Sequence, residues 1–239
     1  MRPGRAGAIV AASVCLVAAA AAPTGVYAAA PRVEQMVVFR SGDAPVRTLR
    51  ASGSAVRVGQ RRCAVATGTP LAALVRSGVG PLRLRDFGSC SRRPRDGGGL
   101  FVTGIGADRN SGLSGWVYKV GNRLGTAGAA DPTGPFGSGR LRAGTRVTWF
   151  YCRVPSNCQR TLVTRTRVQP GGVVVVRVTA HNDQGRGIAA REATVRLDTQ
   201  SAVTDSSGDA RFTVAPGTYT VRAEQADRVR SFPERVRVE

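Results

Sequence analysis

The chain has 239 residues, with 35 Lys and Arg against 15 Asp and Glu, and its formal net charge at pH 7 is +20. A positive charge of this size attracts anionic partners. Aromatic residues, however, make up only 5% of the chain, and Arg is spread along almost every predicted strand. This argues against a nucleic-acid partner, because a nucleic-acid-binding surface needs clustered basic residues beside aromatic residues on which bases stack. The pattern favours a solvated basic surface, with an anionic wall polymer as the alternative partner.

The first thirty residues have the features of a secretory signal peptide. Arg2 and Arg5 precede an apolar run at 6–22, and the small residues at 28–30 offer a cleavage site. We therefore predict export through the general secretory route, giving a secreted or cell-surface protein that begins near residue 31. The alternative is an uncleaved anchor, although the run is Ala-rich and slightly short for a spanning helix.

Four cysteines follow the predicted cleavage site: Cys63, Cys90, Cys152 and Cys158. An even number in an exported chain predicts disulfides, for which three connectivities exist. We favour Cys63–Cys90 together with Cys152–Cys158, because the second pair closes a short loop through a Pro-Ser-Asn turn. Zinc is the alternative, but the spacing contains no Cys-x-x-Cys pair. We expect no metal and no cofactor.

The predicted N-terminal domain, residues 31–158, contains several strands and one helix. The helix is expected over 69–78, where Thr69 can cap the first turn, Pro70 fits it, and Gly78 can supply a left-handed stop. A polar loop at 92–99 leads into one of the later strands. The strands are expected at 37–40, 54–58, 100–103, 115–120 and 147–152. Strands with one helix laid across them predict an α+β unit.

Two of these strands, 115–120 and 147–152, contain both tryptophans of the chain. Each alternates large apolar or aromatic residues with other types, which predicts half-buried strands, and a Gly/Pro loop at 125–139 separates them. Two interpretations of these aromatic residues are open: they build the core of the sheet, or they form a stacking platform for a flat or sugar-like ligand. We favour the core. The candidate ligand-binding residues are Trp116, Tyr118, Trp149, Tyr151 and Phe136.

The predicted second domain, residues 159–239, has no helical pattern. Its strands are expected at 161–168, 173–181, 193–197, 210–214, 218–223 and 229–238. Short alternating strands separated by turns at this spacing predict an all-β sandwich.

The strand 115–120, the Gly-Ala segment at 128–130 and the segment 141–151 together resemble the transcobalamin-like C-terminal domain, a β-grasp-like module of exported proteins. That family typically has a Gly-Trp-x-Tyr-x-Val strand, a Gly-Ala loop and a Gly-x-x-Val-x-Trp-x-Tyr strand. The match covers most of residues 55–152 and implies a β-grasp-like fold with one helix. In the cobalamin-binding relatives this module is one half of a clamp whose partner is a helical barrel. The chain shows no such barrel, so cobalamin is not expected as a ligand.

Residues 204–212 and 216–223 contain a Thr-Asp-x-x-Gly and a Pro-Gly-x-Tyr-x-Val pattern. These resemble the carboxypeptidase-regulatory or transthyretin-like sandwich family, which implies an immunoglobulin- or transthyretin-like domain. The resemblance says little about function, because such sandwiches serve as generic spacers and adhesion modules. The expected fold is therefore mainly β, with a β-grasp-like α+β domain followed by an all-β sandwich.

The sequence contains no nucleophile–base constellation. It has one His, no Gly-x-Ser-x-Gly, no His-Glu-x-x-His and no carboxylates paired at suggestive positions. We therefore expect an exported, non-enzymatic protein with a binding or structural role at the cell surface. Its partner would be a cell-envelope component or another secreted protein. The alternative function is a small-molecule carrier that uses the aromatic strands 116–118 and 149–151.

Overall fold

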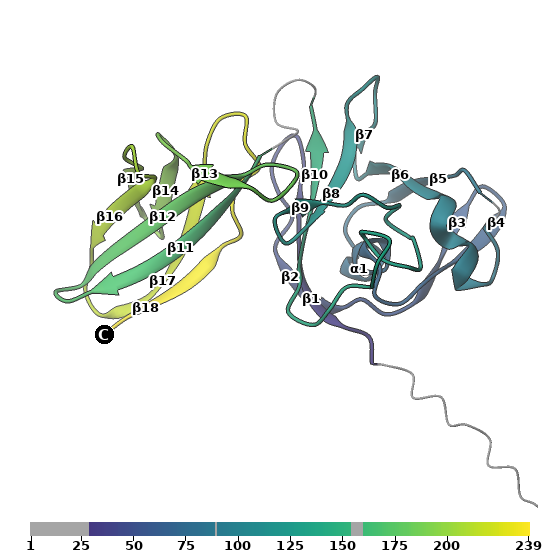
Figure 1. Ribbon diagram of the computed structural model, residues 1–239, viewed down its shortest axis with the longest axis horizontal. Coiled ribbons are helices and arrows are strands. Elements are labelled where there is room, and N and C mark those ends of the chain that lie inside the picture. Colours follow the sequence, from purple (N-terminus) through teal and green to yellow (C-terminus); the bar gives the residue numbers. More distant parts are fainter. Residues whose placement is uncertain (1–28, 89, 154–159) are drawn as a thin grey trace, which may run out of the picture.

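The computed structural model describes residues 29–88, 90–153 and 160–239. The protein is mainly β, as predicted, and its strands form two adjoining parts (Figure 1). We call residues 32–152 the first unit and residues 161–238 the second unit. Most of the predicted signal peptide, up to residue 28, lies outside the described residues. Within the described ranges, no helix combines the length and the apolar character needed to cross a membrane.

A five-stranded sheet forms the middle of the first unit. Its order is β2 (Arg47–Arg50), β1 (Arg32–Val38), β10 (Arg146–Cys152), β8 (Gly115–Val120) and β9 (Arg123–Leu124). Only the β1–β10 pairing in this sheet is parallel. A smaller sheet contains β5 (Leu82–Asp86), β6 (Leu100–Ile105) and β7 (Asp108–Arg109), and β3 (Ser54–Val58) pairs with β4 (Arg61–Val65). The segment predicted as a polar loop at 92–99 contains a short 3-10 helix, η1 (Pro94–Gly99).

Helix α1 (Pro70–Ser77) forms where the capping signals predict it. The Thr69 hydroxyl accepts a hydrogen bond from the backbone N–H of Ala72 at 3.2 Å, and Gly78 ends the helix with a φ of 67°. Leu71 and Leu74 are fully buried and belong to the same core as Trp149. The helix therefore covers one face of the five-stranded sheet.

Cys63 in β4 and Cys90 form a disulfide, as predicted. Cys152 is also disulfide-bonded. Its predicted partner, Cys158, lies outside the described residues.

Replacing both Cys63 and Cys90 by alanine is expected to lower the free energy of unfolding by about 3.5 kcal/mol. The bridge joins positions 27 residues apart, so its loss returns loop freedom to the unfolded chain. Urea denaturation followed by tryptophan fluorescence measures the change. A loss below about 1 kcal/mol would contradict this account of the bridge.

The second unit consists of two four-stranded sheets that pack face to face, which is the predicted sandwich. One sheet contains β11 (Thr161–Gln169), β12 (Val173–His181), β13 (Gly187–Ala189) and β16 (Asp209–Thr213). The other contains β15 (Gln200–Val203), β14 (Thr194–Leu197), β17 (Gly217–Glu224) and β18 (Glu234–Val238). The strand predicted at 229–238 is shorter than expected and begins only after Pro233, which lacks the N–H that a ladder requires.

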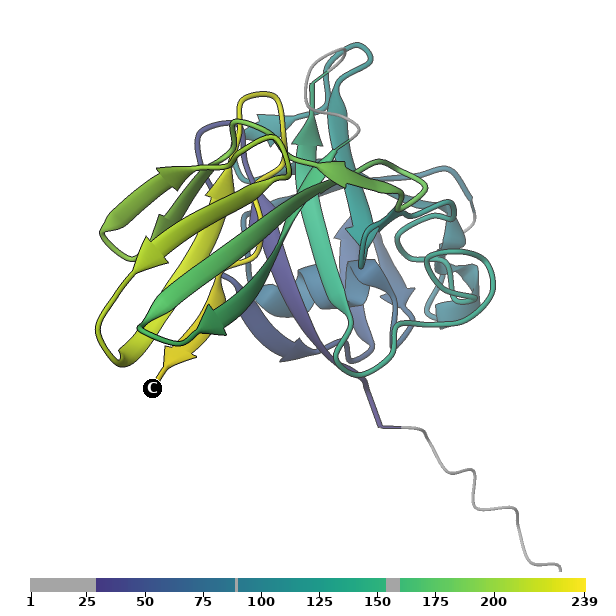
Figure 2. The ribbon, with the colours of Figure 1, turned by 60° about the vertical axis from the view of Figure 1, so that its left-hand side comes forward.

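Strands β1 and β10 are buried on both faces of the five-stranded sheet. On the face away from α1, Met36 and Phe150 pack with Val229 and Phe232 of the second unit. Figure 2 shows the second unit lying against the first. Phe150 is 0% exposed and Trp149, on the opposite face, is 1% exposed. The prediction that 147–152 is half-buried is therefore wrong, because the second unit covers the face that the helix leaves open.

Charged contacts also join the two units. Lys119 Nζ in β8 lies 3.2 Å from Asp183 Oδ1 and donates a hydrogen bond to the carbonyl of His181 at 3.2 Å. Further ion pairs between the units join Asp43 to Arg222 and Arg230, and Arg146 to Glu234. Arg146 also pairs with Glu34 of its own unit. The interface therefore combines an apolar centre with ion pairs.

The predicted boundary after Cys158 leads to an expected result for a fragment from Gln159 to the end of the chain. This fragment should unfold cooperatively by itself, because the core between its two sheets is built from its own residues. It should be less stable than the second unit within the full chain, because Val229 and Phe232 lose their cover. Urea denaturation followed by circular dichroism measures both properties, and a disordered fragment would contradict the boundary.

Candidate functional site

The two aromatic strands pair so that their large side chains meet. In the antiparallel ladder between β8 and β10, Tyr118 lies opposite Trp149 and Trp116 lies opposite Tyr151. Residues directly opposite in such a ladder share a face of the sheet, and these four face the helix side. All four are at least 93% buried, with exposures of 3, 7, 1 and 4% for Trp116, Tyr118, Trp149 and Tyr151. The aromatic residues therefore build the core of the first unit.

Three of the four aromatic side chains have a hydrogen-bond partner that fixes their orientation. Trp116 Nε1 donates to the carbonyl of Asp108 at 3.0 Å. The Tyr118 hydroxyl donates to the carbonyl of Ala127 at 2.7 Å, and burial raises the pKa of this phenol, helped by the nearby charge of Asp131. The Tyr151 hydroxyl donates to a backbone carbonyl in β7 at 2.9 Å. These bonds fix the orientation of the three side chains within the core.

Trp149 differs from its neighbours. Its Nε1 is buried and has no hydrogen-bond partner among the described residues. A buried indole N–H is a donor only, and leaving such a group without an acceptor costs about 1–3 kcal/mol. This donor can therefore recover free energy from an acceptor brought by a ligand.

A cavity of about 170 Å³ opens at the edge of this aromatic core, between β6 and β8. We call it the β6–β8 slot. Its lining comes from Leu100, Phe101 and Val102 of β6, Trp116, Val117 and Tyr118 of β8, Trp149 of β10, and the loop residues Leu124, Gly125, Ala127, Gly128 and Ala129. None of these side chains carries a charge, so the slot suits an uncharged group.

The glycine at 125 allows the loop to close on the slot. A Cβ at this position would lie 2.1 Å from Cζ of Tyr118, far closer than any real contact. The absence of a side chain thus lets the loop backbone lie against the phenol ring. This glycine begins the Gly/Pro segment at 125–139 that separates the two aromatic strands.

Exposed aromatic residues extend from the rim of the slot. Phe101 is 46% exposed and packs edge-to-face with Phe87, which is 65% exposed, at a centroid distance of 6.0 Å. The guanidinium of Arg85 lies 4.6 Å from the Phe87 ring centroid. The sequence predicted 100–103 as a strand and did not place Phe101 at a ligand site. The signal was present, because the alternation of Leu100, Phe101 and Val102 turns Phe101 away from the core.

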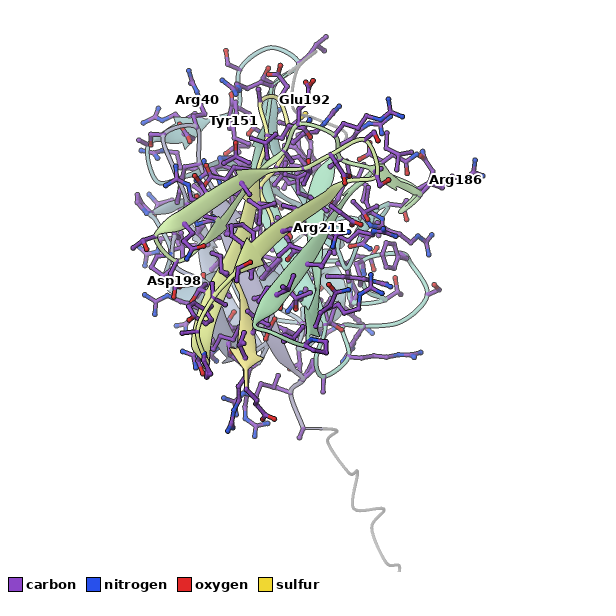
Figure 3. The ribbon with its side chains drawn as sticks, turned by 90° about the vertical axis from the view of Figure 1, so that its left-hand side faces the viewer. Arg40, Tyr151, Arg186, Glu192, Asp198 and Arg211 are labelled. Carbon is purple, nitrogen blue, oxygen red and sulfur yellow. A yellow bond between two sulfur atoms is a disulfide. The ribbon has the colours of Figure 1, made fainter. Side chains whose placement is uncertain are left out.

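The slot does not include every predicted ligand residue. Trp116, Tyr118 and Trp149 line it. Tyr151 lies outside it, with the guanidinium of Arg40 5.5 Å from its ring centroid, as the two labels in Figure 3 show side by side. Phe136 lines a separate hollow of about 230 Å³ and stacks under Arg123 at 4.7 Å. The structure therefore places three of the five candidates in the lining of the slot, and Tyr151 contacts one of them, Trp116, from outside it.

The described residues contain no group of three or more His, Cys, Asp or Glu side chains placed to hold a metal ion. In comparisons of the chain with protein-family models, with curated proteins and with solved structures, nothing matched. The geometry of the β6–β8 slot is therefore the evidence from which a function can be argued.

Proposed function

We propose that this is an exported, non-catalytic binding protein whose β6–β8 slot holds an uncharged group the size of one ring. The observation that carries the proposal is the uncharged, aromatic-lined cavity of about 170 Å³, whose lining residue Trp149 has a buried Nε1 donor without a hydrogen-bond partner among the described residues. A cavity of roughly 150 Å³ accepts benzene, so the volume fits one ring. The ligand class is then a ring that carries an acceptor oxygen or nitrogen.

The lining of the slot supports discrimination by charge and by hydrogen bonding. An ionised group would have to leave water for a site with no compensating charge, which is strongly unfavourable. A ring without an acceptor would fill the volume but leave the indole N–H unpaired. We therefore expect an uncharged acceptor-bearing ring to bind about tenfold more tightly than its hydrocarbon analogue, which corresponds to about 1.4 kcal/mol.

Saturation-transfer NMR on the full chain tests the proposal with three probes: acetophenone, toluene and benzylammonium. Acetophenone should bind, toluene more weakly, and benzylammonium not at all. In the variant Ala129→Met the longer side chain should fill the slot and abolish acetophenone binding. Ala143→Met, which makes the same change at an exposed position, should bind like the unmodified chain. Equal binding by all three probes, or by both variants, would overturn the proposal.

The second candidate is a structural or adhesive role at the cell envelope. It is favoured by the interface, where Lys119 and the other ion pairs hold the two units together over an apolar centre. Such a connection presents two surfaces in a fixed relation. Retention of the full chain on isolated envelope, unchanged in Ala129→Met, would support this role. Saturable ligand binding without envelope retention would support the carrier.

A further inference from the structure

The outer side of the sheet β11–β12–β16 gathers arginine side chains from three neighbouring strands. Arg165 lies directly opposite Arg177, while Arg167 and Arg211 are the two cross-strand neighbours of Val175. All four arginines are exposed. We call them the arginine face; Arg211 is labelled in Figure 3.

The burial of Val175 indicates that arginine side chains lie along this sheet. Val175 belongs to the outer side, since its neighbours Val174 and Val176 point into the sandwich core. It is nevertheless only 3% exposed. The aliphatic stems of Arg167 and Arg211, on either side of it, can supply this cover while their charged ends remain in water. Such packing would hold the guanidinium groups of Arg167 and Arg211 at the surface.

The charge of this face is only partly compensated. Arg177 forms a bidentate pair with Asp209, with both N–O distances at 2.7 Å. The pKa of Asp209 lies below its ordinary value, first because of the hydrogen bond from Arg177, and the charges of Arg211 and Arg167 act in the same direction. The other three arginines have no carboxylate within 4.0 Å among the described residues. Like charges directly opposite in a sheet repel each other, so a bound anion would relieve the repulsion.

Two features indicate the kind of anion. The outer side of β11, β12 and β16 presents no Phe, Tyr or Trp side chain on which a base could stack, and stacking dominates the binding of single-stranded nucleic acid. Neighbouring strands lie about 4.8 Å apart, so Arg167 and Arg211 are roughly 10 Å apart across the sheet. The long side chains of these two arginines can reach inward from that separation to neighbouring phosphates of a flexible chain, and the guanidinium fork matches phosphate oxygens.

We propose that the arginine face docks a linear phosphodiester polymer without bases, such as an anionic polymer of the cell wall. The site is independent of the β6–β8 slot, since it lies in the second unit. The opposite outer face of the sandwich is less suited to this role. There Arg222 is engaged by Asp43, and Arg237 lies 3.5 Å from Glu239.

The test measures binding of the full chain to immobilised poly(glycerol phosphate) at several salt concentrations. Binding should weaken with salt, and Arg167→Gln combined with Arg211→Gln should reduce affinity at least tenfold. The matched control, Arg196→Gln combined with Arg235→Gln, removes the same charge from the opposite outer face and should change affinity less than twofold. Circular dichroism confirms that both double variants are folded.

Three outcomes would overturn the proposal: no binding at low salt, equal losses in both double variants, or equally tight binding of single-stranded DNA. An equal loss would mean that net charge alone attracts the polymer. The slot variant Ala129→Met should bind the polymer normally. Failure of the slot proposal and failure of this one are therefore distinguishable.

Discussion

Replacing Trp149 by alanine is expected to lower the free energy of unfolding by about 3–5 kcal/mol, the usual cost of removing a buried Trp side chain. Trp149 is 1% exposed and packs against Tyr118 at a centroid distance of 5.2 Å. The exposed Phe101, which also lines the slot, provides the control. Phe101→Ala should cost less than about 1 kcal/mol, because that ring is already half in water.

Urea denaturation monitored by circular dichroism measures both variants. If the aromatic residues formed an open stacking platform, the two substitutions would have similarly small effects on stability. A loss below about 1 kcal/mol for Trp149→Ala would therefore contradict the core that the structure shows.

Replacing Asp183 by alanine is expected to destabilise the protein by about 3 kcal/mol, because it removes the carboxylate that pairs with the buried ammonium of Lys119. The side chain of Lys119 is 0% exposed. Lys119→Met keeps the volume and removes the buried ammonium. The side chain of Asp183 is 26% exposed, so its carboxylate can be hydrated and this variant should lose less stability than Asp183→Ala. The control Glu239→Ala breaks an ion pair that is fully at the surface and should change stability by less than about 0.5 kcal/mol.

The combined variant, Lys119→Met with Asp183→Ala, should regain most of the stability lost in Asp183→Ala. Urea is the suitable denaturant, because guanidinium would screen the charges. Equal losses in Asp183→Ala and Glu239→Ala would contradict a buried ion pair at the interface.

The same pair gives the protein a pH dependence of known sign. Burial lowers the pKa of Lys119 below its ordinary value of 10.5, and Asp183 offsets part of this effect. Between the lowered pKa and 10.5 the unfolded chain binds more protons than the folded chain, so stability rises with pH there. The stability of the unmodified chain relative to Lys119→Met should therefore increase from neutral pH to about pH 10. Parallel pH curves for the two proteins would contradict this.

The elements that the sequence predicted best are governed by local signals. Helix α1 begins after Thr69 and ends at Gly78, because capping and a left-handed stop depend only on nearby residues. The Cys63–Cys90 bridge was also predictable, since few cysteines limit the choices. The resemblance to two exported domain families stays a hypothesis.

The features that could not be predicted from the sequence depend on contacts between distant segments of the chain. Lys119 is conspicuous as the only lysine, but its burial requires His181 and Asp183 from the second unit. Burial of 147–152 on both faces has the same origin. Phe136 was grouped with the tryptophans because its loop lies between their strands, yet the loop places it in another hollow. Chain order alone does not reveal which loop residue reaches a cavity.

The most direct test of the β6–β8 slot uses the indole N–H signals of the two tryptophans. In a ¹H–¹⁵N spectrum of the full chain only Trp116 and Trp149 contribute such signals, and Trp116 Nε1 already donates to Asp108 at 3.0 Å. Added acetophenone should move the Trp149 signal downfield as its N–H gains an acceptor, while the Trp116 signal should shift much less. Unchanged Trp149 signals at saturating acetophenone, or equal shifts of both signals, would contradict a ligand site built around Trp149.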